Sequence, residues 1–503
     1  MPANRLSELR KVLLAAGRGR MDPTAYDTAW VARVPDPQDS GCPAFPAALD
    51  WLLAHQRSDG SWGASINYHY DRLLSTLAAA LTLAHWHDQH DGCTDCLARL
   101  EAAQRSIWTQ VPGLRRDPYD TIGFELILQT LLQEARRRAF QLPYSSLDSF
   151  ARVREAKLGL IPPELIYTRN VPTIFSAEFL GDQLDASRLR DLQDANGSIA
   201  SSPSATAYYL VRNPRNAAAR EYLRRVLDRN GGAAPAVDPI DIFEPAWVMY
   251  NIAQALPDPT WAADLIEPHV AGLREILLRM KGVGYNTYFA VPDLDGTATT
   301  FRILAWSGQP VDPAVLMQFE EDDHFRCFPY ERNPSISANV HLLDALRVAP
   351  DFPDRARAIR KVTAFLERSR TLQTFWFDKW HASPYYTTAH AILALGGAHQ
   401  LTDDAIFWII NTQNADGSWG YYESGTAEET AYCLQALVAY WNSGGMVARS
   451  VLQSGAEFLA ASAERLSMRY APLWIGKSLY TPTWVVHSAV LSALAMAESV
   501  LGA

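Results

Sequence analysis

The sequence predicts an all-α fold built from two α/α barrel domains. Apolar residues recur at three- and four-residue spacing over 71–86, 121–140 and 427–441, which is the pattern of helices with a buried face. No convincing series of alternating strands is visible, and the connections are rich in Pro, Gly and Asp. A polar turn followed by a helix occurs at 56–63 and again at 413–420. Such repeats are typical of barrels with two concentric helical layers, and the wide separation of these two copies predicts more than one barrel.

The repeated turns are predicted to be structural. QRSDGSWG at 56–63 returns as QNADGSWG at 413–420, and QDANGSIA at 193–200 is a degenerate copy in which Ile199 replaces the tryptophan. A glutamine side chain can satisfy the backbone at the end of an adjacent helix while the tryptophan packs over the turn. We therefore expect these residues to tie helices together and to do no chemistry.

The composition is that of a globular protein, with 503 residues of which 48% are hydrophobic and 20% charged. The net charge is -10 and no basic stripe is present, which argues against a nucleic-acid partner. The apolar run VLLAA near the N-terminus is too short to span a membrane, so no integral membrane segment or secretion signal is expected. The odd number of scattered cysteines, five, favours a reducing compartment, and we expect a cytoplasmic protein.

Two aspartates separated by one residue, Asp293 and Asp295, stand out in VPDLDGTATT. Such a pair can bind a metal, cap a helix or share a proton. On a continuous helix, side chains two residues apart point about 200° away from each other, so this pair converges only at a helix end or turn. Pro292 and the helical pattern that follows suit a helix N-terminus. Taken alone, the pattern favours Asp293 as an N-cap and Asp295 as a first-turn acid.

Several segments together resemble one family, the class II diterpene cyclases of the terpene cyclase and squalene–hopene cyclase superfamily. The similarity extends to the bacterial halimadienyl and the clerodienyl-type diphosphate synthases. The resemblance implies a β domain made of residues 1–20 and 286–503, a γ domain of residues 21–285 inserted in it, and an active site at their junction. The matching segments, in order, are AYDTAWVA (25–32), DRLLSTLAAAL (71–81), IGFELILQTLLQEA (122–135), NGSIASSPSATAYY (196–209), DIFEPAW (241–247) and GKSLYTPTWVV (476–486).

The family's D-x-D-D motif aligns with DLDG at 293–296. The resemblance implies that Asp295 protonates the terminal alkene of a linear prenyl diphosphate, and that Asp293 orients it. An alkene is a very weak base, so the acid must be kept protonated; burial and a second carboxylate both raise a carboxyl pKa. Gly296 stands where the family commonly has a fourth aspartate, and Thr297 is the candidate for replacing that hydrogen-bond partner.

The resemblance also implies a diphosphate site. The class I ionisation motif D-D-x-x-D is absent, and the nearest segment, EEDDHF at 320–325, is predicted to be a solvated acidic face. The product should therefore keep its diphosphate. Hard oxygen ligands suit Mg²⁺, and the family places an acidic motif just before IGFE. The candidate Mg²⁺ ligands are Asp117, Asp120 and Glu125. The candidate diphosphate-binding cations are Lys477, Lys379 and Arg169.

Aromatic faces stabilise carbocations, and five rings belong to segments that the family brings near the cavity. They are Tyr285, Trp380, Tyr386, Trp474 and Tyr480. The His/Asn base of the plant copalyl diphosphate synthases is missing, with Ala177 at the histidine position and the asparagine position within 234–238. Without that base the first cation can rearrange, which predicts a halimadienyl- or clerodienyl-type decalin. His381 and His390 are the candidates for a later base.

The expected substrate is geranylgeranyl diphosphate, and the alternative is the same chemistry on farnesyl diphosphate with a drimenyl product. A downstream class I synthase or phosphatase is the expected partner, while the oligomeric state stays open. A glycosidase on the same toroid is disfavoured because its two carboxylates would come from separate segments. A zinc prenyltransferase lacks a credible ligand set, and a non-catalytic lipid carrier is suggested by Gly296 alone.

Overall fold

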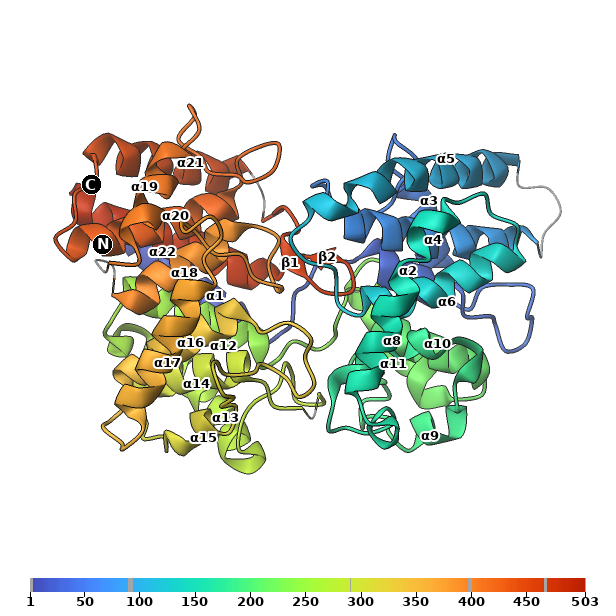
Figure 1. The fold of residues 1–503 in the computed structure, drawn as a ribbon, viewed down its shortest axis with the longest axis horizontal. Coiled ribbons are helices and arrows are strands. Elements are labelled where there is room, and N and C mark those ends of the chain that lie inside the picture. Colours follow the sequence, from blue (N-terminus) through green and yellow to red (C-terminus); the bar gives the residue numbers. More distant parts are fainter. Residues whose placement is uncertain (1–2, 89–93, 290, 397–399, 466–467, 503) are drawn as a thin grey trace.

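The computed structural model describes residues 3–88, 94–289, 291–396, 400–465 and 468–502. Within these ranges the regular elements are helices apart from one short two-stranded hairpin, so the all-α prediction is confirmed. The helices form two domains that lie side by side, and both termini belong to the same domain (Figure 1).

The domain that holds both termini, the β domain, is a closed barrel. Its inner helices contact one another in the order α12 (Phe243–Ala255), α14 (Leu294–Trp306), α16 (Ile336–Val348), α18 (Pro384–Leu395), α20 (Ala427–Asn442) and α22 (Thr483–Leu501), and α22 returns to α12. The remaining helices of this domain are α1 (Ala3–Ala15), η4 (Pro259–Ala262), α13 (Ala263–Met280), α15 (Ala314–Met317), α17 (Arg355–Arg368), α19 (Asp403–Asn411) and α21 (Arg449–Arg465). The inner helices are buried on nearly all sides. Their segments are rich in alanine and other apolar residues for this reason.

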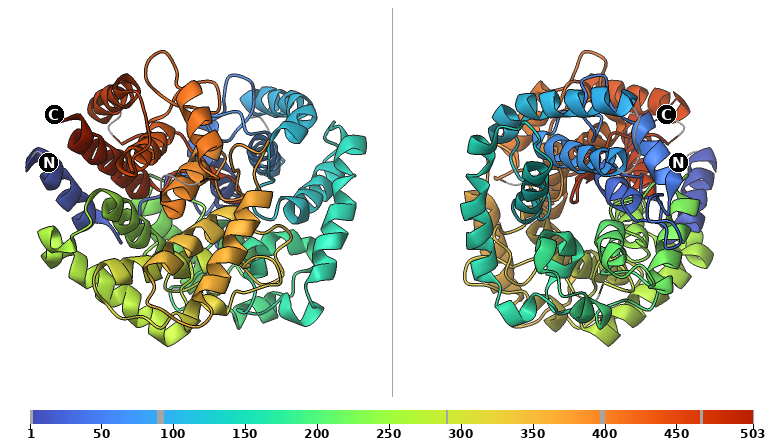
Figure 2. Two further views of the ribbon diagram at one scale, coloured as in Figure 1. Left: turned by 60° about the vertical axis from the view of Figure 1, so that its left-hand side comes forward. Right: turned by 90° about the vertical axis from the view of Figure 1, so that its right-hand side faces the viewer.

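The second domain, the γ domain, is a smaller ring. Its inner elements follow one another as α2 (Ala25–Ala32), α4 (His69–His87), α6 (Phe124–Arg137), η3 (Pro172–Gln183) and α10 (Pro203–Arg212), and α10 packs back on α2. The ring is seen end-on in the right-hand view of Figure 2. Its other helices are α3 (Pro46–Ala54), α5 (Thr94–Gln110), η1 (Val111–Arg116), α7 (Tyr144–Leu147), α8 (Phe150–Leu160), η2 (Pro163–Leu165), α9 (Ala186–Arg190) and α11 (Ala217–Arg229).

The two hydrophobic cores place the domain boundary earlier than predicted. One core contains residues of α1 and then runs from Ala236 to Ala497, and the other runs from Ala25 to Ala234. The predicted boundary after residue 285 therefore differs from the division between the two cores. The physical reason is ring closure: α12 fills the gap between α22 and α14, and α13 packs on α1 and α14. Without these helices the β barrel would be open.

The repeated turns do what the sequence predicts. In the copy at 413–420, the Gln413 Nε2 donates to the carbonyls of Gly417 and Val451, each at 3.0 Å. The Trp419 indole is fully buried and its N–H donates to the Ile409 carbonyl at 2.7 Å. The first copy makes the same contacts with its own helices. These residues join the end of one helix to the next and line no part of the main cavity.

A hairpin of β1 (Trp474–Ile475) and β2 (Leu479–Tyr480) lies between the domains (Figure 1). The Leu479 N–H donates to the Asp71 carboxylate of the γ domain at 3.0 Å. The Ile122 N–H donates to the Gly476 carbonyl at 2.8 Å, while the Ile475 N–H donates to the Trp380 carbonyl of the β domain at 2.9 Å. The hairpin therefore fixes the relative position of the two walls of the junction.

One described helix, α22, is long and apolar enough by composition to cross a membrane. Of its apolar window, 67% is buried inside the fold, where it completes the inner ring of the β domain. Burial of this extent is what the core helix of a folded barrel shows.

Candidate active site

A cavity of about 280 Å³ lies at the junction of the two domains. The β domain contributes Asp295, Trp247 and Trp474 to its wall, and the γ domain contributes Phe175 and Glu125. Most of the wall is apolar or aromatic, with a few charged side chains. A concave, mostly apolar site with few convergent polar groups is the usual form of a small-molecule site.

Asp293 caps α14, as the sequence pattern alone suggests. Its Oδ1 accepts from the Gly296 N–H at 2.6 Å, and the side chain also lines the cavity. Burial and then the neighbouring Asp295 raise the pKa of Asp293 to about 8. A Cβ placed on Gly296 would lie 3.2 Å from the Asp293 Oδ1. The glycine therefore gives the capping carboxylate room to approach the helix backbone.

Asp295 is backed by a histidine that sequence reasoning did not single out. The Asp295 Oδ1 lies 2.5 Å from Nδ1 of His341 on α16, and the His341 Nε2 lies 2.8 Å from Nδ1 of His390 on α18. Both histidines are only 1% exposed. Burial, and then His341 and His381, hold the pKa of His390 well below its usual range. The His341 ring therefore bridges the Asp295 carboxyl group and the neutral imidazole of His390.

The only sequence signal for His341 is a histidine among the apolar residues of a predicted helix, and such a residue is usually part of a core. Asp295 Oδ2 makes no hydrogen bond within the described protein, and Asp295 lines the cavity. The acid therefore has one supported oxygen and one oxygen free to carry a proton.

Thr297 does not replace the missing carboxylate. Its Oγ1 accepts from the Val283 N–H at 3.0 Å and makes no contact with Asp295 in the described structure. The same bond, from a turn N–H to a threonine of the following helix, recurs around both barrels. The recurring pairs are Trp62–Thr76, Ile199–Thr206, Trp376–Thr388 and Trp419–Thr430. Thr297 is thus a structural anchor of the inner ring.

Of the three predicted diphosphate cations, Lys379 lines the main cavity and the other two do not. The Lys379 Nζ donates to Glu331 Oε2 and to the Asn333 carbonyl, each at 2.5 Å. Arg169 instead pairs with Asp194 at 2.7 Å in a separate hollow. The structure therefore does not support its assignment as a diphosphate ligand, because its guanidinium is held by a γ-domain turn.

Lys477 is fully buried and its charge is already neutralised. Its Nζ lies 2.7 Å from Glu178 Oε1 and also donates to the hydroxyls of Ser202 and Ser204. All three of its ammonium protons are therefore used within the protein, and these contacts do not support the predicted diphosphate role. The pair joins the hairpin of the β domain to the γ domain.

Sequence reasoning missed two cations that line the cavity, Arg332 and Lys157. The Arg332 Nη2 donates to both oxygens of Asp120, at 2.8 and 2.6 Å, and its Nη1 lies 3.7 Å from Glu125. The Lys157 Nζ donates to the Tyr330 carbonyl at 3.0 Å. With Lys379 they surround the 328–333 loop, so the cations of the cavity gather at one place.

The predicted Mg²⁺ ligands are only partly brought together. Asp120 and Glu125 both line the cavity, whereas Asp117 does not. Asp117 instead accepts from the backbone N–H groups of His69 and Tyr70 at the start of α4, at 2.5 and 3.1 Å. It caps a helix away from the cavity, so the structure does not support its assignment as a ligand. No cluster of three or more metal-ligating side chains occurs among the described residues.

Four of the five predicted aromatic residues line the cavity: Tyr285, Trp380, Trp474 and Tyr480. Tyr386 is not a lining residue; it lies behind Trp474, with ring centroids 5.1 Å apart. Further rings in the wall were not predicted, and they are Phe175, Phe243, Trp247, Phe289, Phe328 and Tyr330. Their faces surround the apolar part of the cavity.

Neither predicted base reaches the cavity. His381 is fully buried, its Nε2 lies 3.2 Å from Glu428 Oε1, and its ring stacks on Tyr386 at 4.6 Å. His390 contacts His341 instead of a substrate. A terminating base must touch the cation, so the structure supports neither assignment; His390 instead contacts the histidine that backs the acid.

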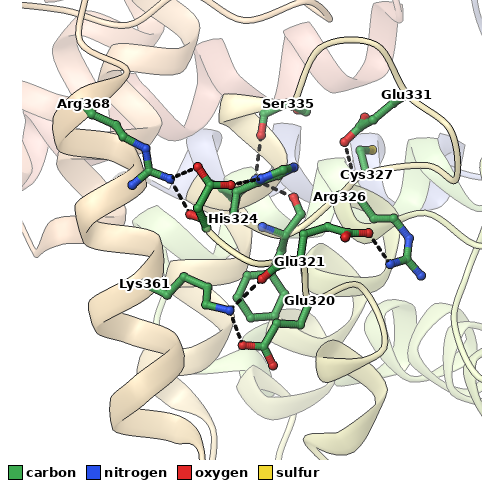
Figure 3. Close-up of polar contacts among 12 residues, drawn as sticks. Glu320, Glu321, His324, Arg326, Cys327, Glu331, Ser335, Lys361 and Arg368 are labelled. Atoms are coloured by element: carbon green, nitrogen blue, oxygen red, sulfur yellow. Dashed lines mark hydrogen bonds and ion pairs between the residues drawn. The ribbon is translucent and has the colours of Figure 1, made fainter. Parts of the chain in front are cut away.

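The acidic segment 320–325 is a surface feature, as predicted. Glu320 pairs with Lys361 at 2.5 Å, Glu321 pairs with Arg326 at 2.6 Å, and none of its residues lines the cavity (Figure 3). Arg357 adds a second cation to Glu320 and, with Lys361, holds its pKa low, at about 2. These carboxylates are therefore engaged by cations of α17 and of the same loop.

A comparison with models of known protein families finds no match. Individual relatives are similar over almost the whole chain. The chain is 37% identical to the Type B diterpene cyclase of Mycobacterium tuberculosis over 98% of its length and 99% of that protein. It is 31% identical to the ent-copalyl diphosphate synthase of Streptomyces sp. over 97% of its length and 94% of that protein.

The fold agrees with these sequence similarities. The ent-copalyl diphosphate synthase from Streptomyces platensis superimposes with a TM-score of 0.80 and 31% sequence identity, and the alignment covers 100% of both chains. Such full-length similarity includes both barrels and the junction between them. The chain therefore belongs to the class II diterpene cyclases and is an enzyme of that family.

Proposed function

We propose that this enzyme cyclises geranylgeranyl diphosphate by protonation and releases a bicyclic diterpenyl diphosphate of the rearranged, halimadienyl or clerodienyl type. The observation that carries the proposal is Asp295, a carboxyl group backed by His341 in an aromatic cavity whose cations gather around one loop. An alkene-protonating acid, a ring-lined space and an anion-binding end are the three parts that this reaction needs.

Asp295 would begin the reaction by giving its proton to the terminal alkene. The alkene's electron pair takes the proton, a tertiary carbocation forms, and Asp295 becomes a carboxylate. The N–H of His341 then stabilises that carboxylate through a charge-assisted hydrogen bond. Asp293 has a raised pKa, so at neutral pH it adds little negative charge beside the acid. The apolar wall excludes the water that would otherwise quench the cation.

The cavity wall supports rearrangement of the first cation. Trp247, Tyr285 and Trp474 present aromatic rings, which stabilise positive charge through their faces. Ala236 and Val237, in the segment where plant copalyl diphosphate synthases would place their asparagine, carry no basic group. The lack of a base there favours hydride and methyl shifts over immediate loss of a proton.

The retained diphosphate would bind around the 328–333 loop, where Lys157, Arg332 and Lys379 meet. Asp120 and Glu125 would hold Mg²⁺, which is usually bound by one or two carboxylates together with substrate phosphates. Bound there, Mg²⁺ would neutralise charge on the diphosphate. Glu125 is buried, and burial followed by Asp120 raises its pKa, so a cation beside it is favourable. A class I synthase or a phosphatase would then consume the product.

The test is a product assay with Mg²⁺. The protein is incubated with geranylgeranyl diphosphate and separately with farnesyl diphosphate, and the products are dephosphorylated and identified by mass spectrometry and NMR. A rearranged C20 decalin alcohol is expected, while a drimane alcohol from farnesyl diphosphate alone would replace the proposed substrate. The Asp295→Asn variant should form no cyclic product. Wild-type turnover by that variant would refute the acid assignment.

A further inference from the structure

The charged side chains around the 328–333 loop balance one another. Lys157, Arg332 and Lys379 carry three formal positive charges, and Asp120, Glu125 and Glu331 carry three formal negative charges. Each cation already has a protein partner within 3.0 Å. A diphosphate arriving here would therefore meet no net positive charge, and the carboxylates would repel it.

The Arg332 guanidinium lies between the carboxylates of Asp120 and Glu125, where a bound metal ion would also lie. Its Nη2 holds both oxygens of Asp120, at 2.8 and 2.6 Å, and its Nη1 lies 3.7 Å from Glu125. The contact crosses the domain junction, since Arg332 belongs to the β domain and its partners belong to the γ domain. The two carboxylates that Mg²⁺ would need are therefore the two that Arg332 already neutralises.

We propose, on the basis of the function above, that Arg332 is an exchangeable placeholder that moves from Asp120 and Glu125 to the substrate's diphosphate when Mg²⁺ is taken up. Guanidinium groups bind carboxylates and phosphates with the same two-point geometry, so one side chain suits both positions. Mg²⁺ on Asp120 and Glu125 adds two positive charges, and the junction becomes net positive only when the metal is present. The enzyme thereby couples metal uptake to diphosphate binding.

The exchange would also open the junction. In the free protein the 328–333 loop is tied to the γ domain by Arg332 and by the bond from Lys157 to the Tyr330 carbonyl. Arg332 is 31% exposed and Asp120 17%, so their contact is accessible to ions from solvent. Release of Arg332 removes one of the two ties while the loop stays anchored through Glu331, which accepts from the Cys327 N–H at 2.9 Å.

The experiment measures the affinity of the protein for a metal ion and for diphosphate, without prenyl substrate. The proposal predicts that one variant changes these two affinities in opposite directions. Mn²⁺ is used as the metal probe and its free concentration is followed by EPR; inorganic diphosphate is titrated by calorimetry at saturating Mg²⁺. Arg332→Gln should bind Mn²⁺ about tenfold more tightly than wild type, because the competing cation is gone, and bind diphosphate about tenfold more weakly. A residue with a merely structural role would weaken both.

Two further variants control the result. Lys379→Gln removes a cation whose ion pair is with Glu331 and not with Asp120 or Glu125 in the described structure, so it should weaken diphosphate binding and leave Mn²⁺ affinity unchanged. If Arg332→Gln does not fold by far-UV circular dichroism, Arg332→Lys, which keeps the charge but loses the two-point contact, should raise Mn²⁺ affinity by a smaller factor. Unchanged or weaker Mn²⁺ binding in the folded Arg332 variant overturns the exchange. Because no turnover is measured, that outcome is independent of the product assay.

Discussion

His341 Nδ1 lies 2.5 Å from Oδ1 of Asp295, and the contact joins two neighbouring helices of the inner ring, α16 and α14. His390 on the next inner helix supports His341 at 2.8 Å. The DLDG motif at 293–296 has Gly296 where the family commonly has a fourth aspartate. His341 is therefore the side chain that supports Asp295 in this protein. A carboxyl group held from one side presents its other oxygen to the cavity in a fixed direction.

Replacement of His341 is expected to slow the chemical step. His341→Ala leaves the Asp295 carboxylate without its donor, and we expect kcat to fall on the order of a hundredfold with little change in KM. The pH–rate profile should shift as well, because the acid's partner is gone. Steady-state kinetics and thermal unfolding are measured together. A variant with wild-type kcat and pH profile would show that the contact is only structural.

Asp293 is expected to make stability depend on pH. Its pKa is about 8 in the folded protein and about 3.9 in an unfolded chain, so the folded state holds a proton that the unfolded state releases between these values. Its contribution to the free energy of unfolding is therefore fully present below about pH 4 and is lost as pH rises toward 8.

Asp293→Asn can still cap α14 but does not titrate. Relative to wild type, it should gain stability as pH rises, by up to about 1.4 kcal/mol per pH unit. Urea unfolding of both proteins at pH 5, 6, 7 and 8 measures the difference. Parallel curves would mean that Asp293 is ionised in the folded protein.

Gly417 is expected to be essential to its turn. Its φ is +85°, and a Cβ there would lie 2.3 Å from the Ser454 carbonyl oxygen, so Gly417→Ala must shift backbone. We expect a loss of about 2–4 kcal/mol. Gly444 is the matched control, with φ of +90° and no atom within 4 Å of the point that a Cβ would occupy. Gly444→Ala should cost only about 1 kcal/mol in the same denaturation assay.

Lys477 is expected to matter for stability and not for diphosphate affinity. Lys477→Met leaves Glu178 buried without its cation, which should cost about 3–5 kcal/mol. Adding Glu178→Gln removes the unpaired charge and should restore part of that loss. Thermal unfolding and calorimetric binding of inorganic diphosphate test the two halves. Weaker diphosphate binding with unchanged stability would return Lys477 to the ligand set.

The two barrels and the acid Asp295 could be predicted from the sequence. The Trp419 indole contacts a helix end ten residues away in sequence, and Asp293 caps the helix that it precedes. Most of the predicted aromatic residues also line the cavity. These features follow from contacts between residues that are close in sequence or from the resemblance of whole segments to a family. Both are visible in the sequence alone.

The partners of buried charges follow from the packing of distant helices. Lys477 meets Glu178 across 299 residues, and Arg332 meets Asp120 across 212. No local pattern encodes such pairs, so a buried lysine and a substrate-binding lysine look alike in sequence. The same holds for His341, which reaches Asp295 only because neighbouring inner helices turn these faces toward each other. Helix periodicity and turn chemistry act over a few residues, so the sequence by itself specifies the barrels. Desolvation and charge pairing act through space. Only the closed rings of helices therefore determine which side chains face the cavity.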